Sequence, residues 1–262
     1  MTAATLPLVA RGVRAEWIRA GGRGRLWTVL VPAAILVPVA ISFGIAVVAE
    51  SFARIPGQLT VLAVSTANAG YWVITISVVL GAVAGADGQA AESRYHAGEH
   101  VRVAIPRVWP VLAGRWLFYG GASAGAALAA LAAVLVGLPV VSPLVYGAVS
   151  LTDPVGLRLL WTVPLLAFFA AGAGVGVGAL AKSPLVAAAV IVVWTYIAEP
   201  AVGYLPSGIG LQRFMPVLNT VYATGQDAVL GPPWGRNGAL LYVCALCAAV
   251  LLVATIGKVN RK

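Results

Sequence analysis

His96, Glu99 and His100 form the pattern H-x-x-E-H, in which two histidines can bind zinc and a glutamate can activate a water molecule. These two histidines are the only ones in the chain, so a third protein ligand would have to be a carboxylate such as Glu92. Gly98 also interrupts the helical turn that would bring both imidazoles to one ion. We interpret the motif as part of a polar loop, and we predict no metal site, no bound cofactor and no catalytic residue.

Two further patterns resemble reactive sites but have unsuitable surroundings. Cys244 and Cys247 have the spacing of a thiol redox pair or of half a zinc site, yet they lie in an apolar run without basic neighbours. The segment 176–183 is one residue short of a phosphate-binding P-loop, with Ala181 where the second glycine belongs. An apolar run precedes it and Pro184 follows, whereas a P-loop needs a strand before it and a helix after it. We therefore predict that this chain binds no nucleotide and is not an enzyme.

The composition describes the setting in which these residues lie. Of the 262 residues, 61% are apolar and 10% are charged, and the mean hydropathy is +0.95. A soluble globular protein has about a quarter charged residues, so this chain lacks the polar surface for a soluble fold. The composition excludes a soluble enzyme and a disordered chain, and the presence of only two cysteines excludes a disulfide scaffold. In a membrane protein, the net charge of +9 reflects basic cytoplasmic segments rather than a nucleic-acid partner.

The apolar runs predict an all-α, polytopic membrane protein with six transmembrane helices, since about 20 residues cross a bilayer. Thirteen of the seventeen Lys and Arg residues then fall on one side, which places both termini in the cytoplasm. The excess of Arg over Lys, with abundant Ala and Gly, is typical of a GC-rich bacterial genome, so we expect a bacterial plasma membrane. The expected spans are Trp27–Val48, Asn68–Ala86, Val111–Leu138, Leu159–Ala181, Pro184–Tyr204 and Ala239–Ile256.

We expect a single transmembrane domain over residues 1–262, with two long connections between its spans. The parts are an interfacial helix (1–26), spans one and two (27–86), an inner loop (87–110), spans three to five (111–204), an external segment with short helices (205–238), and span six with its tail (239–262).

The N-terminal segment is too polar to cross a membrane. Leu6, Val9, Val13 and Trp17 recur at helical spacing, while arginines fall on the other faces. This pattern indicates a basic amphipathic helix that lies along the cytoplasmic face of the bilayer. A solvated tail that only satisfies the positive-inside rule remains the alternative.

The inner loop also carries a helical pattern. Residues 89–97 favour helix, and Gly98 can end it. A short charged helix between two spans can dock on a soluble partner, and a solvated loop is the alternative.

Several loose motifs, taken in their order along the chain, resemble the type-2 ATP-binding-cassette (ABC) transporter permeases, the transmembrane subunits of these transporters. One departure is Glu99, where that family commonly has Thr or Ser. The matching positions are Glu16-Trp17-Ile18-Arg19, Glu92, Gly98, Ile105-Pro106-Arg107, Gly114-Arg115 and the external segment Leu211-Gln-Arg213-Phe-Met-Pro216.

The resemblance implies half of an exporter for an amphipathic, lipid-like or drug-like compound. Two permease subunits, identical or related, would pack together in the lipid bilayer with two cytoplasmic ATPase subunits, which bind ATP and Mg. The inner loop would form the coupling helix, and the N-terminal helix would lie at the interface. The implied coupling residues are Asp87, Glu92, Arg94, Tyr95, His96 and Glu99, and the implied interfacial residues are Glu16, Trp17 and Arg19.

Glu199 is the only acidic residue well inside an expected span. Intramembrane carboxylates are costly and face protein or water, so it would line a path, cap a helix break or carry a proton. By family analogy the other path-lining candidates are Asn68, Tyr71, Trp72, Trp194, Thr195 and Tyr196, although anchoring of aromatic side chains at the interface explains several of them equally well.

Two other functions remain open at this stage. A proton-coupled secondary carrier could use Glu199, although the two halves of the chain show no evident repeat. A membrane assembly factor that transports nothing is the second alternative.

Overall fold

A computed structural model describes residues 5–55, 62–94, 105, 107–181, 183–227 and 230–260. These residues form helices and loops without a strand, and six helical stretches are long and apolar enough to cross a membrane, which confirms the predicted multi-pass, all-α fold. The stretches are η1–α2 (Leu26–Leu30 as a π-helical turn, then Val31–Ala53), α3–α4 (Thr66–Ala69 and Tyr71–Arg94), α6 (Val108–Val141), α8 (Pro154–Ala181), α9–η2–α10 (Pro184–Val193, the π-helical Trp194–Ala198, and Glu199–Val202) and α13 (Gly235–Val259).

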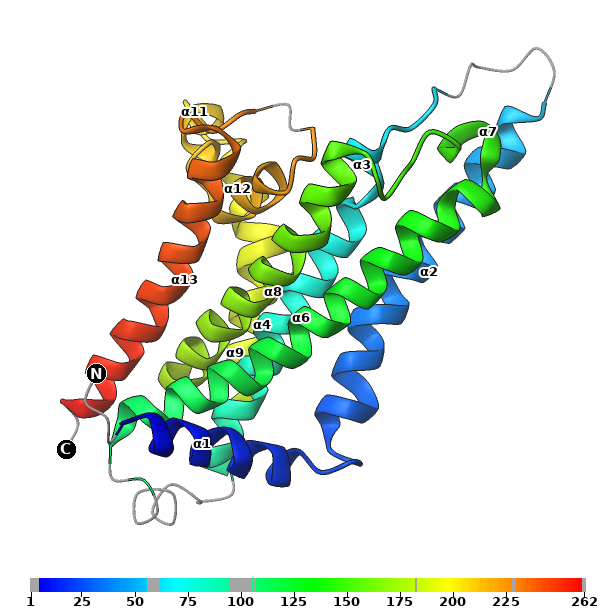
Figure 1. The fold of residues 1–262 in the computed structure, drawn as a ribbon. Helices are drawn as coiled ribbons and strands as arrows, with labels where there is room; N and C mark the ends of the chain where they lie inside the picture. The colour runs from blue at the N-terminus through cyan, green and yellow to red at the C-terminus, as the bar shows by residue number, and fades with distance from the viewer. Residues whose placement is uncertain are drawn as a thin grey trace.

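Four shorter helices lie at the two ends of this bundle (Figure 1). α1 (Thr5–Ala20) crosses one end, where α13 also finishes. α7 (Pro143–Tyr146), α11 (Gly208–Gln212) and α12 (Pro216–Ala223) lie at the opposite end, together with α3. The ends are called the α1 end and the α12 end below.

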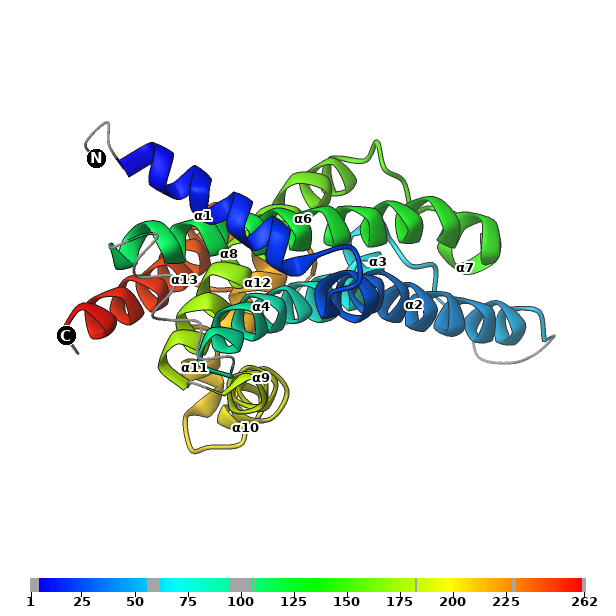
Figure 2. The same ribbon diagram turned by 90° about the horizontal axis from the view of Figure 1, so that it is seen from below.

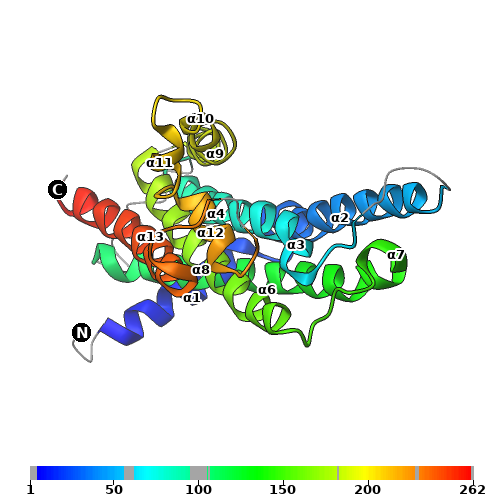
Figure 3. The same ribbon diagram turned by 90° about the horizontal axis from the view of Figure 1, so that it is seen from above.

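Helices α4 and α8 form the closely packed centre of the bundle. A Cβ atom added at Gly85 would collide with the carbonyl oxygen of Ala171, and one added at Gly174 would collide with that of Ala82. Small residues therefore let these two backbones touch, which is how helices associate in lipid without a strong hydrophobic driving force. Most of α4 and α8 is buried, whereas little of α9 is. α2, α9 and α13 lie around the periphery (Figure 3).

A second close approach fixes α1 on α6, as seen from the α1 end (Figure 2). Gly12 faces Gly114, and a Cβ atom on Gly114 would come within 2.9 Å of the Gly12 Cα atom. The buried face of α1 contains Val9, Gly12 and Glu16, whereas Trp17 is 65% exposed. The packed face is therefore not the apolar stripe that the sequence pattern emphasises.

The structure moves two span boundaries. α4 continues to Arg94 and α6 begins at Val108, so residues 89–94 belong to the second span rather than to a separate loop helix. The sequence placed this boundary too early because Gln89 and Glu92 are polar, but in the folded chain both bond to Arg115 of α6. The rest of the expected coupling helix lies outside the described residues.

The first span is also longer than expected, and it contains a buried carboxylate. α2 extends to Ala53 and includes Glu50, so the expectation that Glu199 is the only acidic residue within a span was wrong. Glu50 accepts hydrogen bonds from Ser142 Oγ at 2.9 Å and from the Leu144 backbone nitrogen at 3.1 Å, and it pairs with Arg54. It thereby joins α2 to the start of α7.

Candidate functional site

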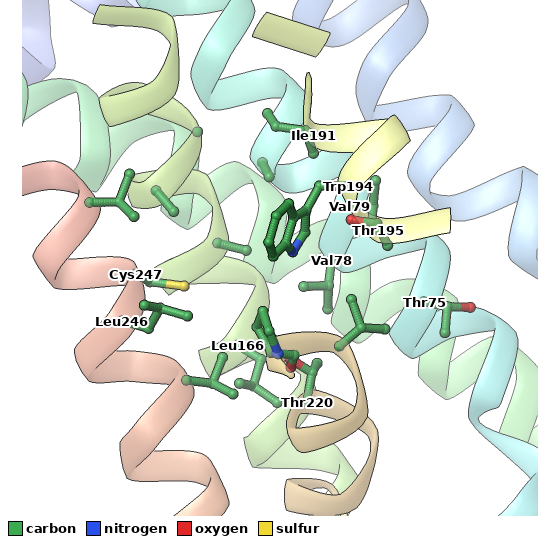
Figure 4. Close-up of a pocket in the computed structure, with 18 of the residues that line it drawn as sticks. Thr75, Val78, Val79, Leu166, Ile191, Trp194, Thr195, Thr220, Leu246 and Cys247 are labelled. Carbon is green, nitrogen blue, oxygen red and sulfur yellow. The ribbon is translucent and has the colours of Figure 1, made fainter. Parts of the chain in front are cut away.

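The principal candidate site is a cavity of about 420 Å³ between α4, α8, η2, α12 and α13, called the apolar cavity below (Figure 4). Its wall is made almost entirely of aliphatic side chains, with Trp194 lying across the centre of the view opposite Val78. Leu246 and Cys247 contribute from α13. A concave apolar site of this size, with few polar groups, is the usual form of a small-molecule binding site.

The two sides of the apolar cavity are built differently. α4 and α8 supply one side, and close packing at Gly174, itself a lining residue, holds their backbones together. The other side begins where α9 passes into η2, and this π-helical turn sets the direction of Trp194 and Thr195. π-Helical turns inside α-helices occur frequently at functional sites because they re-aim side chains.

A second cavity of about 230 Å³ adjoins the first, and we call it the acidic cavity. Thr195, Val217 and Val221 line both spaces, so the two are contiguous. The charged residues that line the acidic cavity are Glu199 and Asp227.

The two carboxylate oxygens of Glu199 have different surroundings. Oε1 accepts a hydrogen bond of 2.9 Å from the backbone nitrogen of Leu218, in the first turn of α12. A carboxylate is favourable there because the first amides of a helix lack partners inside the helix. Oε2 is buried, and it has no hydrogen-bond partner among the described residues. Glu199 therefore caps α12 with one oxygen and buries the other without a hydrogen bond from the described residues.

The expected path residues separate into two groups. Trp194 and Thr195 line the apolar cavity, and Tyr71, Thr195 and Glu199 line the acidic cavity. The remaining three line neither space, and their contacts are structural: Asn68 bonds to Asp227 at 3.4 Å, the Tyr196 hydroxyl donates to the Thr75 carbonyl at 2.9 Å, and Trp72 stacks edge-on against Tyr71.

At the α1 end, the side chains of Glu16, Gln89, Glu92 and Arg115 form a polar cluster. Arg115 is 2% exposed, and its guanidinium donates to Glu16 Oε1 at 2.8 Å, to Glu92 Oε2 at 2.6 Å and to Gln89 Oε1 at 2.6 Å. Lys258 of α13 lies 3.5 Å from Glu92. This cluster joins α1, α4, α6 and α13, and it gives three hydrogen-bond acceptors to Nε and Nη1 of a buried arginine.

The expected coupling and interfacial residues mostly have partners inside the chain. Glu92 bonds to Arg115, and Asp87 bonds to Arg25 at 3.1 Å, so neither side chain is presented freely to another protein. Arg19 bonds to the Gly88 carbonyl at 2.5 Å and pairs with Glu16, and Trp17 packs edge-on against Trp27 and Phe118. Tyr95, His96 and Glu99 lie outside the described residues, as does the side chain of Arg94.

The patterns that resembled reactive sites do not form a site in the described part of the chain. No group of three His, Cys, Asp or Glu side chains there could hold a metal ion. Cys247 is part of the apolar wall, and Cys244 is half-buried on the same helix. His96, His100 and Lys182 lie outside the described residues.

Comparison with known proteins gives no further assignment. No protein-family model, curated protein or solved structure matches the chain. The resemblance to ABC permeases therefore rests on the sequence motifs alone, and the function below is a proposal.

Sequence reasoning missed the structural partners of its own motifs. Arg115 was noted only as part of a Gly-Arg step, yet a charged residue one turn inside a span must find a carboxylate. The two residues of that step have separate jobs: Gly114 admits α1, and Arg115 bonds to Glu16 on it. Asp227 was missed because it follows α12 in a polar loop, with no local pattern to mark it.

Proposed function

We propose that the chain is the membrane-spanning permease subunit of an ABC exporter, which moves an amphipathic, lipid-like or drug-like compound. The observation that carries the proposal is the pair of contiguous cavities within the spanning bundle. An apolar space that ends beside a carboxylate suits a ligand with an apolar body and one polar group. Such a space has no evident use in a protein that only anchors others.

The energy source in this proposal is a separate ATPase subunit that binds ATP and Mg. The 176–183 segment departs from a P-loop, and its residues 176–181 belong to the packed helix α8. The complex would contain two permease subunits and two ATPase subunits in a bacterial plasma membrane, with both termini of this chain in the cytoplasm.

The polar cluster supplies a route from the ATPase to the cavity. The 95–107 connection leaves from the α1 end, between α4 and α6. At that end, Glu92 of α4 bonds to Arg115 of α6. Val78 and Thr75, more than three turns further along α4, line the apolar cavity. A displacement of the connection would therefore move one wall of the cavity through a stiff helix, which is the physical requirement for coupling.

The test is ATP-driven transport by the purified complex. The tagged chain would be isolated in mild detergent with its co-purifying ATPase and reconstituted into proteoliposomes with a fluorescent amphipathic probe. We expect accumulation with ATP, none with the chain alone, and none with an ATPase whose P-loop lysine is replaced.

Three results would contradict the proposal. ATP hydrolysis by the chain alone would remove the need for a partner. Transport driven by a pH gradient without ATP would favour a proton-coupled carrier that uses Glu199. A stable ATPase complex that never moves a probe, and whose hydrolysis no probe stimulates, would favour an assembly factor.

A further inference from the structure

The free oxygen of Glu199 is the starting observation. Glu199 is 3% exposed, lines the acidic cavity and leaves Oε2 without a partner among the described residues. A carboxylate removed from water is unfavourable unless a cation, a hydrogen-bond donor or a proton accompanies it. The α12 amide on Oε1 compensates one side of the carboxylate, and a cation in the acidic cavity would compensate the remaining charge.

The charge around both cavities has one sign. The chain has seventeen basic and eight acidic residues. Among the described residues, those that line the two spaces include Glu199 and Asp227 and no Lys, Arg or His. Asp227 is held by Asn68, a neutral donor, rather than by an arginine. The contrast with Glu92 and Glu50, which both bond to arginine, indicates that the acidic cavity is built without its own counter-charge.

The shape of the two spaces matches a ligand with a polar end. The larger space is apolar apart from the hydroxyl groups of its threonines and the indole of Trp194, and it meets the smaller one at Thr195. Together they have the size of sites that take drug-sized molecules. An apolar body in the first space would leave its terminal group beside Glu199.

We infer that the cavities bind an amphipathic monovalent cation, with its apolar body against Trp194 and its ammonium group beside the Glu199 carboxylate. This assignment names the ligand class of the proposed transport site and rests on that function only for the later movement of the ligand. Binding itself belongs to the single chain and is measurable without a partner.

The experiment uses the full chain in phosphatidylcholine nanodiscs and three probes with one apolar body. These are 4-(1-naphthyl)butylamine, the corresponding alcohol and the corresponding carboxylate, at pH 7. The unfolding temperature is followed against probe concentration, since a ligand that binds the folded state stabilises it. We expect the amine to bind about tenfold more tightly than the alcohol, the effect of one charge-assisted hydrogen bond, and the carboxylate to bind most weakly.

The decisive variant is Glu199→Gln, which keeps an oxygen for the Leu218 amide. It should bind the alcohol as before and lose the preference for the amine, so alcohol binding also shows that the variant is folded. Asp227→Asn should reduce the preference by a smaller factor. Glu50→Gln is the matched control, because Glu50 is a buried carboxylate at the same end that lines neither cavity.

Equal binding of amine and alcohol by the unaltered chain would overturn the inference and would point to a proton as the partner of Glu199. An amine preference that survives in Glu199→Gln, or that disappears in Glu50→Gln, would overturn it as well.

The outcome is separable from that of the transport test. A preference for the amine without ATP-driven transport would support the proposed binding site and contradict the proposed exporter function. ATP-driven transport of the alcohol or carboxylate, unchanged by Glu199→Gln, would support the exporter function and contradict the assignment of a cationic ligand.

Discussion

Glu92 and Glu199, two buried carboxylates at opposite ends of the bundle, have contrasting surroundings. At the α1 end Glu92 bonds to Arg115 and Gln89 and lies close to Lys258. At the α12 end Glu199 has one backbone amide on Oε1, and Oε2 has no hydrogen-bond partner in the described part of the chain. A fully paired carboxylate holds helices together. An incompletely paired carboxylate can still form an ion pair or a hydrogen bond with a ligand that binds later. The difference gives Glu92 a structural role and supports our proposal that Glu199 recognises a ligand.

The largest loss of stability should come from replacing Arg115, the centre of the polar cluster at the α1 end. Arg115→Gln removes the buried cation that Glu16 and Glu92 share and leaves beside them only the more exposed Arg19 and Lys258. We expect this change to lower the free energy of unfolding by about 3–5 kcal/mol. Unfolding in dodecylmaltoside micelles with increasing SDS measures this change. Arg25→Gln is the control, because the Arg25–Asp87 pair is exposed and should be nearly neutral. Equal losses in both variants would mean that burial of the cluster does not matter.

The next largest loss of stability should come from disturbing the close packing of α4 against α8. Gly174→Val places methyl groups against the Ala82 carbonyl and should lower stability by about 1–3 kcal/mol or more through overpacking. Gly125→Val on α6 meets open space and should change stability by less than about 0.5 kcal/mol. The same unfolding titration compares them, and a tolerant Gly174 would show that the α4–α8 wall is not rigid.

Asn219 holds the start of α12, the helix that Glu199 caps. Its side chain donates to the carbonyls of Arg213 and Met215 and accepts from Trp234 Nε1, all within 3.0 Å. Asn219→Ala should cost about 1–3 kcal/mol, because buried polar groups lose their partners. We also expect weaker binding of the naphthyl amine, since α12 carries the Leu218 amide. Unaltered amine affinity in a destabilised variant would separate α12 from ligand recognition.

The smallest effect on stability should come from the unpaired end. Glu199→Gln preserves the acceptor for Leu218 and removes a charge that lacks a full partner, so we expect a change of less than about 1 kcal/mol. Glu92→Gln should be clearly worse in the same titration, because it leaves Arg115 with one carboxylate fewer. A reversed order would break the comparison between the two ends.

Composition and hydropathy were sufficient to predict the six spans and their helical class. The pairing of Arg115 could not be predicted from local pattern, because its partners are distant in sequence. Gln89 and Glu92 reach it where α4 packs against α6, and Glu16 reaches it where α1 crosses α6 at Gly12 and Gly114.

The candidate site was predicted in part. Trp194, Thr195 and Glu199 stood out as polar or aromatic residues in an apolar run, and they do line cavities. The π-helical turn that aims the first two residues depends on tertiary packing and leaves no periodic signal, as does the placement of Asp227 on the same cavity as Glu199.

The most direct test of the account asks whether the apolar cavity is the place that a transported ligand occupies. ATP-driven uptake of a fluorescent cationic amphipath into proteoliposomes would be compared for Ala170→Trp, which fills the cavity from α8, and Ala133→Trp, which adds the same side chain to the exposed face of α6. We predict loss of uptake in the first variant and wild-type uptake in the second. Wild-type uptake with the cavity filled would contradict the account.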